Sequence, residues 1–303
     1  MSRATIFESF GGPDVLEVRE VPEPHAGAGE VRVAVAAVGL NPVDWAVVGN
    51  ADLAGMFGVS LPSGFANDFA GTVDEVGDGV TGFSVGDRVF GGVFGRAAAD
   101  QVVVAPQVLH RTPDGVDDTT ASTLDIAART AAAALAAIDL TSGDTLLIGG
   151  AAGGVGVFAI QLAVLAGARV IGSGSESSAD FIRSLGAEPV VYGDGLADRV
   201  RELAPQGISA ATDLFGTETA EAALALGVPG DRISTIAAQN SGLPVKTAGG
   251  YDAVEGTLER IAGLIADGSI QVPIAATFPL EQIQDAVTLQ AGRHVKGKVV
   301  VTL

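Results

Sequence analysis

The pattern of apolar and polar positions changes near Thr119. Before this point, short apolar runs alternate with polar residues and stop at Gly, Pro or Asp, as in short strands joined by turns. After it, segments with apolar residues at helical spacing alternate with short runs rich in β-branched residues. Such alternation predicts a parallel sheet with helices on both faces. The chain is therefore predicted to hold a compact β domain followed by an α/β domain.

The individual strands and helices follow from these runs. In the first part, the predicted strands cover residues 30–40, 71–77, 87–92 and 100–106. In the second part, an Ala-rich segment and a later amphipathic segment predict helices at 117–140 and 254–268. The remaining predicted strands cover residues 145–150, 170–174, 188–193, 211–216, 232–238, 243–249 and 296–303.

The segment from Asp144 to Ser175 has the pattern of a strand, a glycine-rich turn, a helix and a second strand. A helix N-terminus above such a turn attracts a pyrophosphate through its free N–H groups and its dipole. In the fingerprint G-x-G-x-x-G, Ala151 replaces the first glycine. A tight turn in an ordinary α/β protein is the structural alternative. We predict a dinucleotide site formed by Ala151, Gly153, Gly154, Val155 and Gly156.

The end of the second strand bears on the choice of dinucleotide. NAD sites commonly carry an acidic residue about 20 residues past the first glycine, and Gly174 lies near that position. Glu176 argues against NADP, because a carboxylate repels a 2′-phosphate. Hydroxyl groups at this place can donate to phosphate oxygens, so NADP is favoured over NAD. The predicted contacts are Ser173, Gly174, Ser175 and Ser178.

Composition restricts the class of protein. The 303 residues give room for two domains, and the net charge of −19 opposes binding to nucleic acid or to anionic membranes. No apolar run reaches the ~18 residues of a membrane span, and no secretory signal is visible. The absence of cysteine excludes disulfides, a thiolate nucleophile and cysteine-ligated metal. These features predict a cytoplasmic enzyme.

Four blocks occur in a characteristic order: GLNPVDW (39–45), NDFAGTVDEVGDGVTGFSVGDRV (67–89), AAGGVG (151–156) and GRHVKGKVVV (292–301). With them, the chain resembles the zinc-independent, quinone oxidoreductase group (zeta-crystallin-like) of the medium-chain dehydrogenase/reductase superfamily. The resemblance implies an α/β fold with a GroES-like β domain and a Rossmann domain, a doubly wound parallel sheet. It also implies a homodimer paired through the sheet edge, for which residues 243–249 are the candidate strand.

The resemblance further implies domain boundaries and an active site. A catalytic GroES-like domain is expected over 1–118, a Rossmann NADP-binding domain over 119–260, and a returning segment over 261–303. The active site is expected in the cleft between the domains.

The first candidates for this active site are Asn41, Asp44 and Trp45. In the family, the Asn of the motif Asn-Pro-Val-Asp lies beside the nicotinamide and the substrate, and Asn41 matches it. Asp44 is expected either to orient Asn41 or a water, or simply to stabilise a turn. Trp45 is expected either to line the substrate pocket or to be a core aromatic.

Further cofactor contacts are implied at Thr130, Tyr192 and Lys298. Thr130 matches a family Thr that hydrogen-bonds the nicotinamide carboxamide, although helices also hold threonines for packing. Tyr192 resembles a Tyr near the adenosine but comes one position early. Lys298 resembles a family lysine near the cofactor, and an ordinary cation at the start of a strand is the alternative.

Residue types at the zinc positions of related alcohol dehydrogenases predict no metal site. Asn41 and Asn67 stand there, and amides are poor zinc ligands. The three histidines are scattered singly. Without a Lewis acid, an acceptor that is already electrophilic is favoured.

The predicted function is therefore hydride transfer from NADPH to a quinone or an α,β-unsaturated carbonyl compound. No protein proton donor is evident. The alternatives are a non-catalytic, crystallin-like NADPH-binding protein and a zinc-free alcohol or sugar dehydrogenase.

Overall fold

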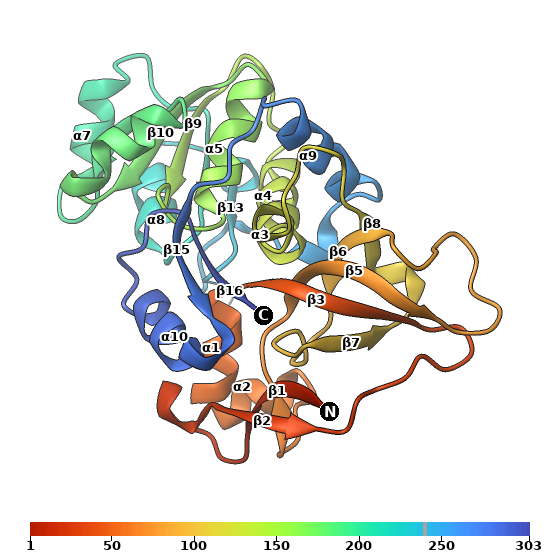
Figure 1. The fold of residues 1–303 in the computed structure, drawn as a ribbon. Helices are drawn as coiled ribbons and strands as arrows, with labels where there is room; N and C mark the ends of the chain where they lie inside the picture. The colour runs from red at the N-terminus through yellow and green to blue at the C-terminus, as the bar shows by residue number, and fades with distance from the viewer. Residues whose placement is uncertain (239–240) are drawn as a thin grey trace. The chain divides into compact units, whose positions relative to one another are not determined.

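The computed structural model describes residues 1–238 and 241–303, which form two compact units (Figure 1). The first unit contains residues 1–126, 258–269 and 274–303. The second contains residues 127–257 and 270–273. The last strand of the chain therefore packs with the first hundred residues.

The first unit is built on two sheets. The larger sheet has the strand order β15-β16-β3-β5-β6-β8, with β7 paired to β3. Its pairs are antiparallel except for β15 with β16. The strands are β3 (Val31–Gly39), β5 (Asp68–Val76), β6 (Arg88–Gly92), β7 (Gln101–Val104), β8 (Leu109–Arg111), β15 (Ile274–Pro279) and β16 (Lys298–Thr302). The smaller, antiparallel sheet contains β2 (Glu17–Val21), β1 (Ser2–Phe7) and β4 (Ser63–Gly64) in that order.

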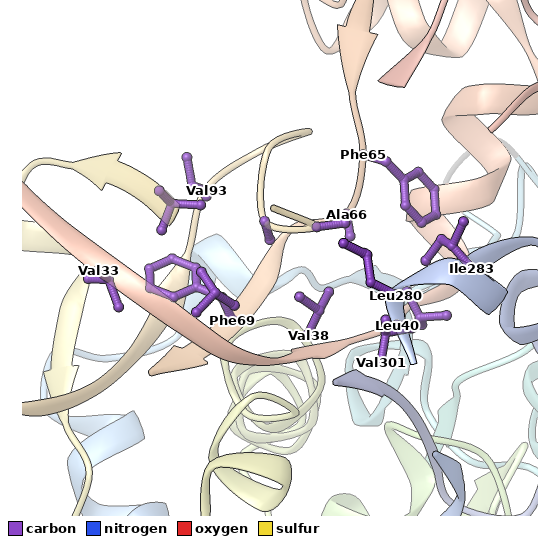
Figure 2. Close-up of a cluster of buried hydrophobic side chains, with 14 of the residues drawn as sticks. Val33, Val38, Leu40, Phe65, Ala66, Phe69, Val93, Leu280, Ile283 and Val301 are labelled. Atoms are coloured by element: carbon purple, nitrogen blue, oxygen red, sulfur yellow. The ribbon is translucent and has the colours of Figure 1, made fainter. Parts of the chain in front are cut away.

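Helices in the first unit complete its core. Buried side chains alternate along β3, as expected for a strand with one face on the core. Figure 2 shows this core, to which strands, loops, η6 and α10 contribute the labelled residues Val33, Val38, Leu40, Phe65, Ala66, Phe69, Val93, Leu280, Ile283 and Val301. The helices are η1 (Pro13–Val15), α1 (Pro42–Gly49), α2 (Ala51–Met56), η2 (Pro106–Val108), α3 (Asp118–Ala121), α9 (Thr257–Ala266), η6 (Leu280–Gln282) and α10 (Ile283–Ala291).

The second unit contains a parallel sheet with the strand order β11-β10-β9-β12-β13-β14. Numbered within the unit, this is the order 3-2-1-4-5-6 of a Rossmann fold. The prediction of a parallel sheet is thereby confirmed. The strands are β9 (Thr145–Gly149), β10 (Arg169–Gly174), β11 (Glu188–Val191), β12 (Ala210–Asp213), β13 (Ile233–Thr235) and β14 (Lys246–Thr247).

Helices connect these strands. α5 is buried along most of its length, so apolar residues occupy nearly every face of it. The helices are α4 (Asp125–Ala137), α5 (Gly156–Leu165), η3 (Glu176–Ser178), α6 (Ala179–Ser184), α7 (Leu196–Leu203), α8 (Glu218–Ala225), η4 (Gly230–Arg232) and η5 (Gly250–Asp252).

Two of the predicted elements differ clearly from the structure. The single helix expected over 117–140 is broken into α3 and α4. Between them, the hydroxyls of Ser122 and Thr123 donate to the carbonyls of Thr119 and Thr120, at 2.9 and 2.7 Å. Such side-chain bonds compete with helical hydrogen bonding. The edge strand expected over 243–249 is only Lys246–Thr247.

Within residues 1–238 and 241–303, no helix is both long enough and apolar enough to cross a bilayer.

Candidate functional sites

The carboxyl ends of β9, β10 and β11 bring most of the predicted dinucleotide contacts together. The N–H of Ala151, after β9, donates to the carbonyl of Ser173 in β10, at 3.0 Å. The N–H of Tyr192, after β11, donates to the carbonyl of Gly174, at 3.1 Å. Ligands of open α/β sheets bind outside these carboxyl ends. The ring of Tyr192 is half-exposed.

Close backbone packing explains the glycine that begins α5. A Cβ on Gly156 would lie 2.4 Å from the carbonyl oxygen of Ala151 and 2.5 Å from that of Gly150. Gly153 is less confined, because its nearest atom would be the carbonyl oxygen of Gly150 at 3.3 Å. Gly156 therefore serves the packing of the turn, whereas Gly153 leaves space next to it. The N–H groups of this first turn are those that can hold a pyrophosphate.

A cluster of hydroxyls follows β10. Ser175 Oγ lies 2.7 Å from Ser178 Oγ and 3.0 Å from Ser177 Oγ. Ser173 and Ser178 are buried, and Arg183, the nearest downstream cation, pairs instead with Asp180 at 2.7 Å. The serine cluster could supply several donors to one anionic group.

Gly174 has a reason to be glycine that the sequence did not reveal. A Cβ there would lie 2.6 Å from Cδ1 of Ile182, a residue that is fully buried. Packing of β10 on α6 therefore accounts for the missing side chain. Because packing alone explains the glycine, the absence of an acidic residue at this position supports NADP less strongly than the sequence suggests.

Thr130 belongs to the second unit and is buried in α4. Its hydroxyl lies 3.3 Å from the point where a Cβ on Gly250 would stand. The small residue at 250 leaves space beside this hydroxyl. Its role toward a nicotinamide carboxamide stays a prediction.

A buried polar cluster in the first unit surrounds Asn41, and Asn41 links two charged groups in it. Asn41 Nδ2 donates to a carboxylate oxygen of Asp68 at 2.9 Å, and Asn41 Oδ1 accepts from the Lys298 ammonium at 2.7 Å. Lys298 also donates to the carbonyl of Leu40 at 3.0 Å. Asn41 and Lys298 are each only 2% exposed, and Asp68 is fully buried. If the Asn41 amide were flipped, its NH₂ group would face the Lys298 ammonium and its oxygen would face the Asp68 carboxylate. The charges of these two groups therefore fix the orientation of the amide.

The other half of this cluster is Asp44 with Asn67. Pro42 begins α1, where its lack of N–H costs nothing. In the same first turn, Asp44 accepts the backbone N–H of Asn41 at 2.7 Å and the side-chain amide of Asn67 at 2.5 Å. Asn67 Oδ1 in turn accepts the N–H of Gly95 at 2.9 Å. Asp44 therefore both stabilises the turn and orients Asn41. We call Asn41, Asp44, Asn67, Asp68 and Lys298 the Asn41 cluster.

Burial shifts the titration of the charged members. Burial raises the pKa of the Asp44 carboxyl to about 7. Burial and the negative charge of Asp125 hold the pKa of Asp68 well above its usual range. Burial also lowers the pKa of Lys298, which the carboxylates of Asp68 and Asp44 oppose. The ammonium and the carboxylates therefore depend on one another for their charge.

The raised pKa of Asp44 predicts a pH-dependent cost in stability. In an unfolded chain an Asp titrates near ~3.9. The folded protein therefore binds this proton more tightly, and the free energy of unfolding should fall as pH rises from about 4 to about 7, then level off. Asp44→Asn removes this titration. Relative to the variant, the wild type should lose about 2–3 kcal/mol between pH 5 and pH 8, measured by urea unfolding. A difference independent of pH would contradict this.

Sequence reasoning missed two aromatic residues near Asp44 and Asn67. These two polar residues line a small hollow together with Val43, Val59 and Phe94. The ring of Phe94 is stacked on that of Phe57, with centroids 4.9 Å apart, and both rings are more than a third exposed. The hollow itself encloses only about 10 Å³, roughly the room for one water. In the sequence, the position of Phe94 within the glycine-flanked segment 91–95 could have indicated an exposed aromatic residue.

Trp45 lies elsewhere in the first unit. It lines a second cavity, together with Leu16 and Val287, and packs partly against the core. The guanidinium of Arg293 lies 5.4 Å from the centroid of its ring. The packing of Trp45 fits the predicted role of a core aromatic, and its role at the substrate pocket stays a prediction.

Comparison with known proteins decides the family. Residues 27–114 match the alcohol dehydrogenase GroES-like domain, and residues 185–301 match the zinc-binding dehydrogenase family. A quinone oxidoreductase from Pseudomonas aeruginosa is 31% identical over 99% of this chain and 99% of its own length. This chain belongs to the quinone oxidoreductase group of the medium-chain dehydrogenase/reductase family. The predicted GroES-like domain and Rossmann domain are thereby confirmed.

Two further relatives of this oxidoreductase bear on its chemistry. An NADPH-dependent alkenal/one oxidoreductase from Arabidopsis thaliana is 27% identical over 99% of the chain and 79% of its own length. A mycobacterial protein solved in complex with NADPH is 26% identical, has a TM-score of 0.86, and is matched over 100% of both chains. Family membership makes this chain an oxidoreductase and implies a nicotinamide cofactor.

The zinc implied by the second family match does not fit the residues of this oxidoreductase. The oxygen of Asn41 already accepts an ammonium, and that of Asn67 accepts the N–H of Gly95. A cation 2.7 Å from Asn41 Oδ1 opposes a second cation there. Across residues 1–238 and 241–303, no group of three His, Cys, Asp or Glu residues could hold a metal ion. Metal independence itself stays a prediction.

The contacts of Lys298 give it a role the resemblance did not imply. Its ammonium is engaged inside the first unit, on Asn41 and Leu40. It is more than a cation at the start of a strand, because it is the positive member of a buried cluster. The contact joins residues 257 positions apart in sequence, which no local pattern can reveal.

Proposed function

We propose that this chain is an NADPH-dependent reductase that transfers a hydride to a quinone or an α,β-unsaturated carbonyl compound without a metal ion. The proposal is carried by the amide oxygens of Asn41 and Asn67. They already accept hydrogen bonds, from the Lys298 ammonium and from the backbone N–H of Gly95 respectively. These positions offer no Lewis acid to activate an alcohol. An acceptor that is already electrophilic needs none.

The glycine turn and the serines after β10 are the proposed binding site for NADPH. Bound there, the cofactor supplies the hydride. We assign the pyrophosphate to Gly153, Gly154, Val155 and the N-terminus of α5, with Ala151 and Gly156 shaping the turn. The cluster of Ser175 and Ser178, with Ser173 and Gly174 beneath it, would hold the 2′-phosphate, Tyr192 the adenosine and Thr130 the carboxamide.

The exposed aromatic pair supports a flat, conjugated acceptor. Phe94, on which Phe57 stacks, lines the small hollow that Asp44 and Asn67 also line. Aromatic rings prefer stacked or edge-to-face contacts with other π-systems. The carboxamide of Asn41 is fully engaged, so we assign it a positioning role for Asp68 and Lys298 rather than a direct contact with the acceptor. The proton that completes the reduction can come from water.

Turnover assays test this function directly. NADPH oxidation should be observed with 1,4-naphthoquinone or cyclohex-2-enone, should exceed that with NADH, and should survive prolonged chelation. Phe94→Ala should lower kcat/KM for the naphthoquinone about two- to tenfold, because one ring–ring contact is worth ~0.5–1.5 kcal/mol. Phe83→Ala, which changes a Phe outside the hollow, is the matched control.

Three results would reject parts of the proposal. Binding of NADPH without turnover of any acceptor would leave a cofactor-binding protein. Reduction of NADP⁺ by simple alcohols would instead make the protein a zinc-free alcohol dehydrogenase. Loss of activity on chelation, restored by zinc, would overturn the argument from Asn41 and Asn67. We also propose a homodimer, which a dimeric mass in light scattering would support and a monomeric mass would reject.

A further inference from the structure

The loop that follows β11 is held by an arginine from the next helix. Arg199, in α7, donates four hydrogen bonds to the backbone carbonyls of residues 191–194, and all three nitrogens of its guanidinium take part. The donor–acceptor distances are 3.0 Å to Val191, 3.2 Å to Tyr192, 2.8 Å to Gly193 and 2.7 Å to Asp194. One side chain therefore fixes the carbonyls of four consecutive residues.

Two glycines allow these carbonyls to converge. Gly193 and Gly195 have φ angles of 92° and 81°, a region that residues with a side chain rarely adopt. A Cβ on Gly193 would meet nothing within 4 Å, so the backbone conformation accounts for this glycine. A Cβ on Gly195 would lie 3.2 Å from Nη1 of Arg199. The segment Tyr-Gly-Asp-Gly and the arginine four residues after it therefore form one structural unit.

The same loop is tied to the edge of the sheet where the dinucleotide contacts gather. The N–H of Tyr192 donates to the carbonyl of Gly174, directly before the serine cluster, at 3.1 Å. The N–H of Gly193 donates to Oε1 of Glu218, the first residue of α8, at 2.5 Å. Because α8 follows β12 and the strand order is β11-β10-β9-β12, this bond joins segments on either side of β10 and β9. The loop thus borders the carboxyl ends of these two strands.

We propose that Arg199 is a positioning residue for the cofactor, which fixes the loop 191–194 in the shape that the adenosine end of NADPH requires. The inference rests on the proposed function, which assigns the adenosine to Tyr192 and the 2′-phosphate to the serine cluster. A loop that is ordered before the cofactor arrives removes the conformational entropy cost of ordering it on binding. Arg199 acts through this loop and needs no contact of its own with the cofactor.

An adenosine fragment tests this role without turnover. Adenosine 2′,5′-bisphosphate is titrated into the whole protein by isothermal calorimetry, and NADPH is titrated by fluorescence. Arg199→Met keeps a long side chain but removes every donor. Both ligands should bind about five- to thirtyfold more weakly, as expected when binding must order the backbone of about one residue. The factor should be the same for both, because only the adenosine end is affected.

Two further variants separate positioning from folding. Arg199→Lys keeps the charge and is the milder change if the methionine variant does not fold. One ammonium cannot serve four carbonyls, so this variant should still bind the bisphosphate about threefold more weakly or worse. Arg201→Met is the matched control on the same helix, since Arg201 pairs with Asp198 and contacts none of the four carbonyls. It should leave both affinities unchanged, and circular dichroism confirms that each variant is folded.

The outcomes distinguish this inference from the proposed function. If the wild type binds neither ligand, the proposed function fails, and the inference fails with it. If the wild type binds both, and the folded variants of Arg199 bind the bisphosphate as tightly, NADPH binding stands and the role of Arg199 is overturned. Binding of NADPH without the bisphosphate overturns it too, and so does a much larger loss for NADPH than for the bisphosphate.

Discussion

Replacing Lys298 by methionine is expected to lower the free energy of unfolding by about 3–5 kcal/mol, as measured by urea unfolding at pH 7.5. Removing one partner of a buried charged group leaves the rest uncompensated, with a cost of ~3–5 kcal/mol. Methionine fills similar space, but it cannot donate to Asn41 Oδ1 or to the carbonyl of Leu40. The buried carboxyls of Asp44 and Asp68 would also lose their nearest positive charge.

Lys246→Met is the matched control. Lys246 also begins a strand and also donates to a carbonyl, that of Ala137 at 2.6 Å. Its side chain is 41% exposed, and its ion pair with Asp139 is long, at 3.8 Å. Water can replace these contacts, so the loss should stay below about 1 kcal/mol.

A double variant checks that charge is the cause. Asp68→Asn in the Lys298→Met background removes one of the uncompensated carboxyls. The double variant should be less destabilised than the sum of the two single variants. Equal stability of Lys298→Met and the wild type, or simple additivity in the double variant, would show that the cluster is not held by its charges.

Local signals carried much of the fold. The glycine turn, the helix after it and the alternating strands are each encoded within about thirty residues, and the parallel sheet follows from them. The edge strand at 243–249 was less well predicted, because a short strand depends on its neighbour β13 more than on its own sequence. The break between α3 and α4 depends on hydroxyl groups whose bonds a hydrophobic pattern does not register.

The candidate site was harder to read for a physical reason. Asn41 and Asp44 were found by their motif, yet their partners Asn67 and Lys298 come from distant segments. A pattern identifies which residues are unusual, but burial and partners decide what each can do. For Asn41, burial and two charged partners support the positioning role that we propose in place of a direct substrate contact.

Gly174 shows how one residue can serve two explanations. The sequence interpretation was that a missing acid makes room for a 2′-phosphate. The structure adds that a Cβ at this place would lie 2.6 Å from Cδ1 of the buried Ile182, so the Ile182 side chain would have to shift. The proposed preference for NADPH therefore rests on the hydroxyls of Ser175 and Ser178, which contact each other directly.

The two glycines of the turn should separate folding from cofactor binding. In Gly156→Ala the new methyl would lie within 2.6 Å of backbone atoms of Gly150 and Ala151, which cannot move independently. We expect a loss of about 1–3 kcal/mol in the free energy of unfolding, typical of overpacking. Gly153→Ala meets only one atom, at 3.3 Å, and should fold with nearly unchanged stability.

Cofactor affinity should respond in the opposite order to stability. A methyl at Gly153 would stand in the space that a pyrophosphate needs beside the N-terminus of α5, and charged hydrogen bonds are worth ~1.5–3 kcal/mol. Fluorescence titration should therefore show NADPH binding weakened about ten- to a hundredfold in Gly153→Ala. Gly143→Ala, with no atom within 4 Å of the new methyl, is the control for both measurements. If Gly153→Ala binds NADPH like the wild type, this turn does not hold the pyrophosphate, and the cofactor site must be sought elsewhere in the second unit.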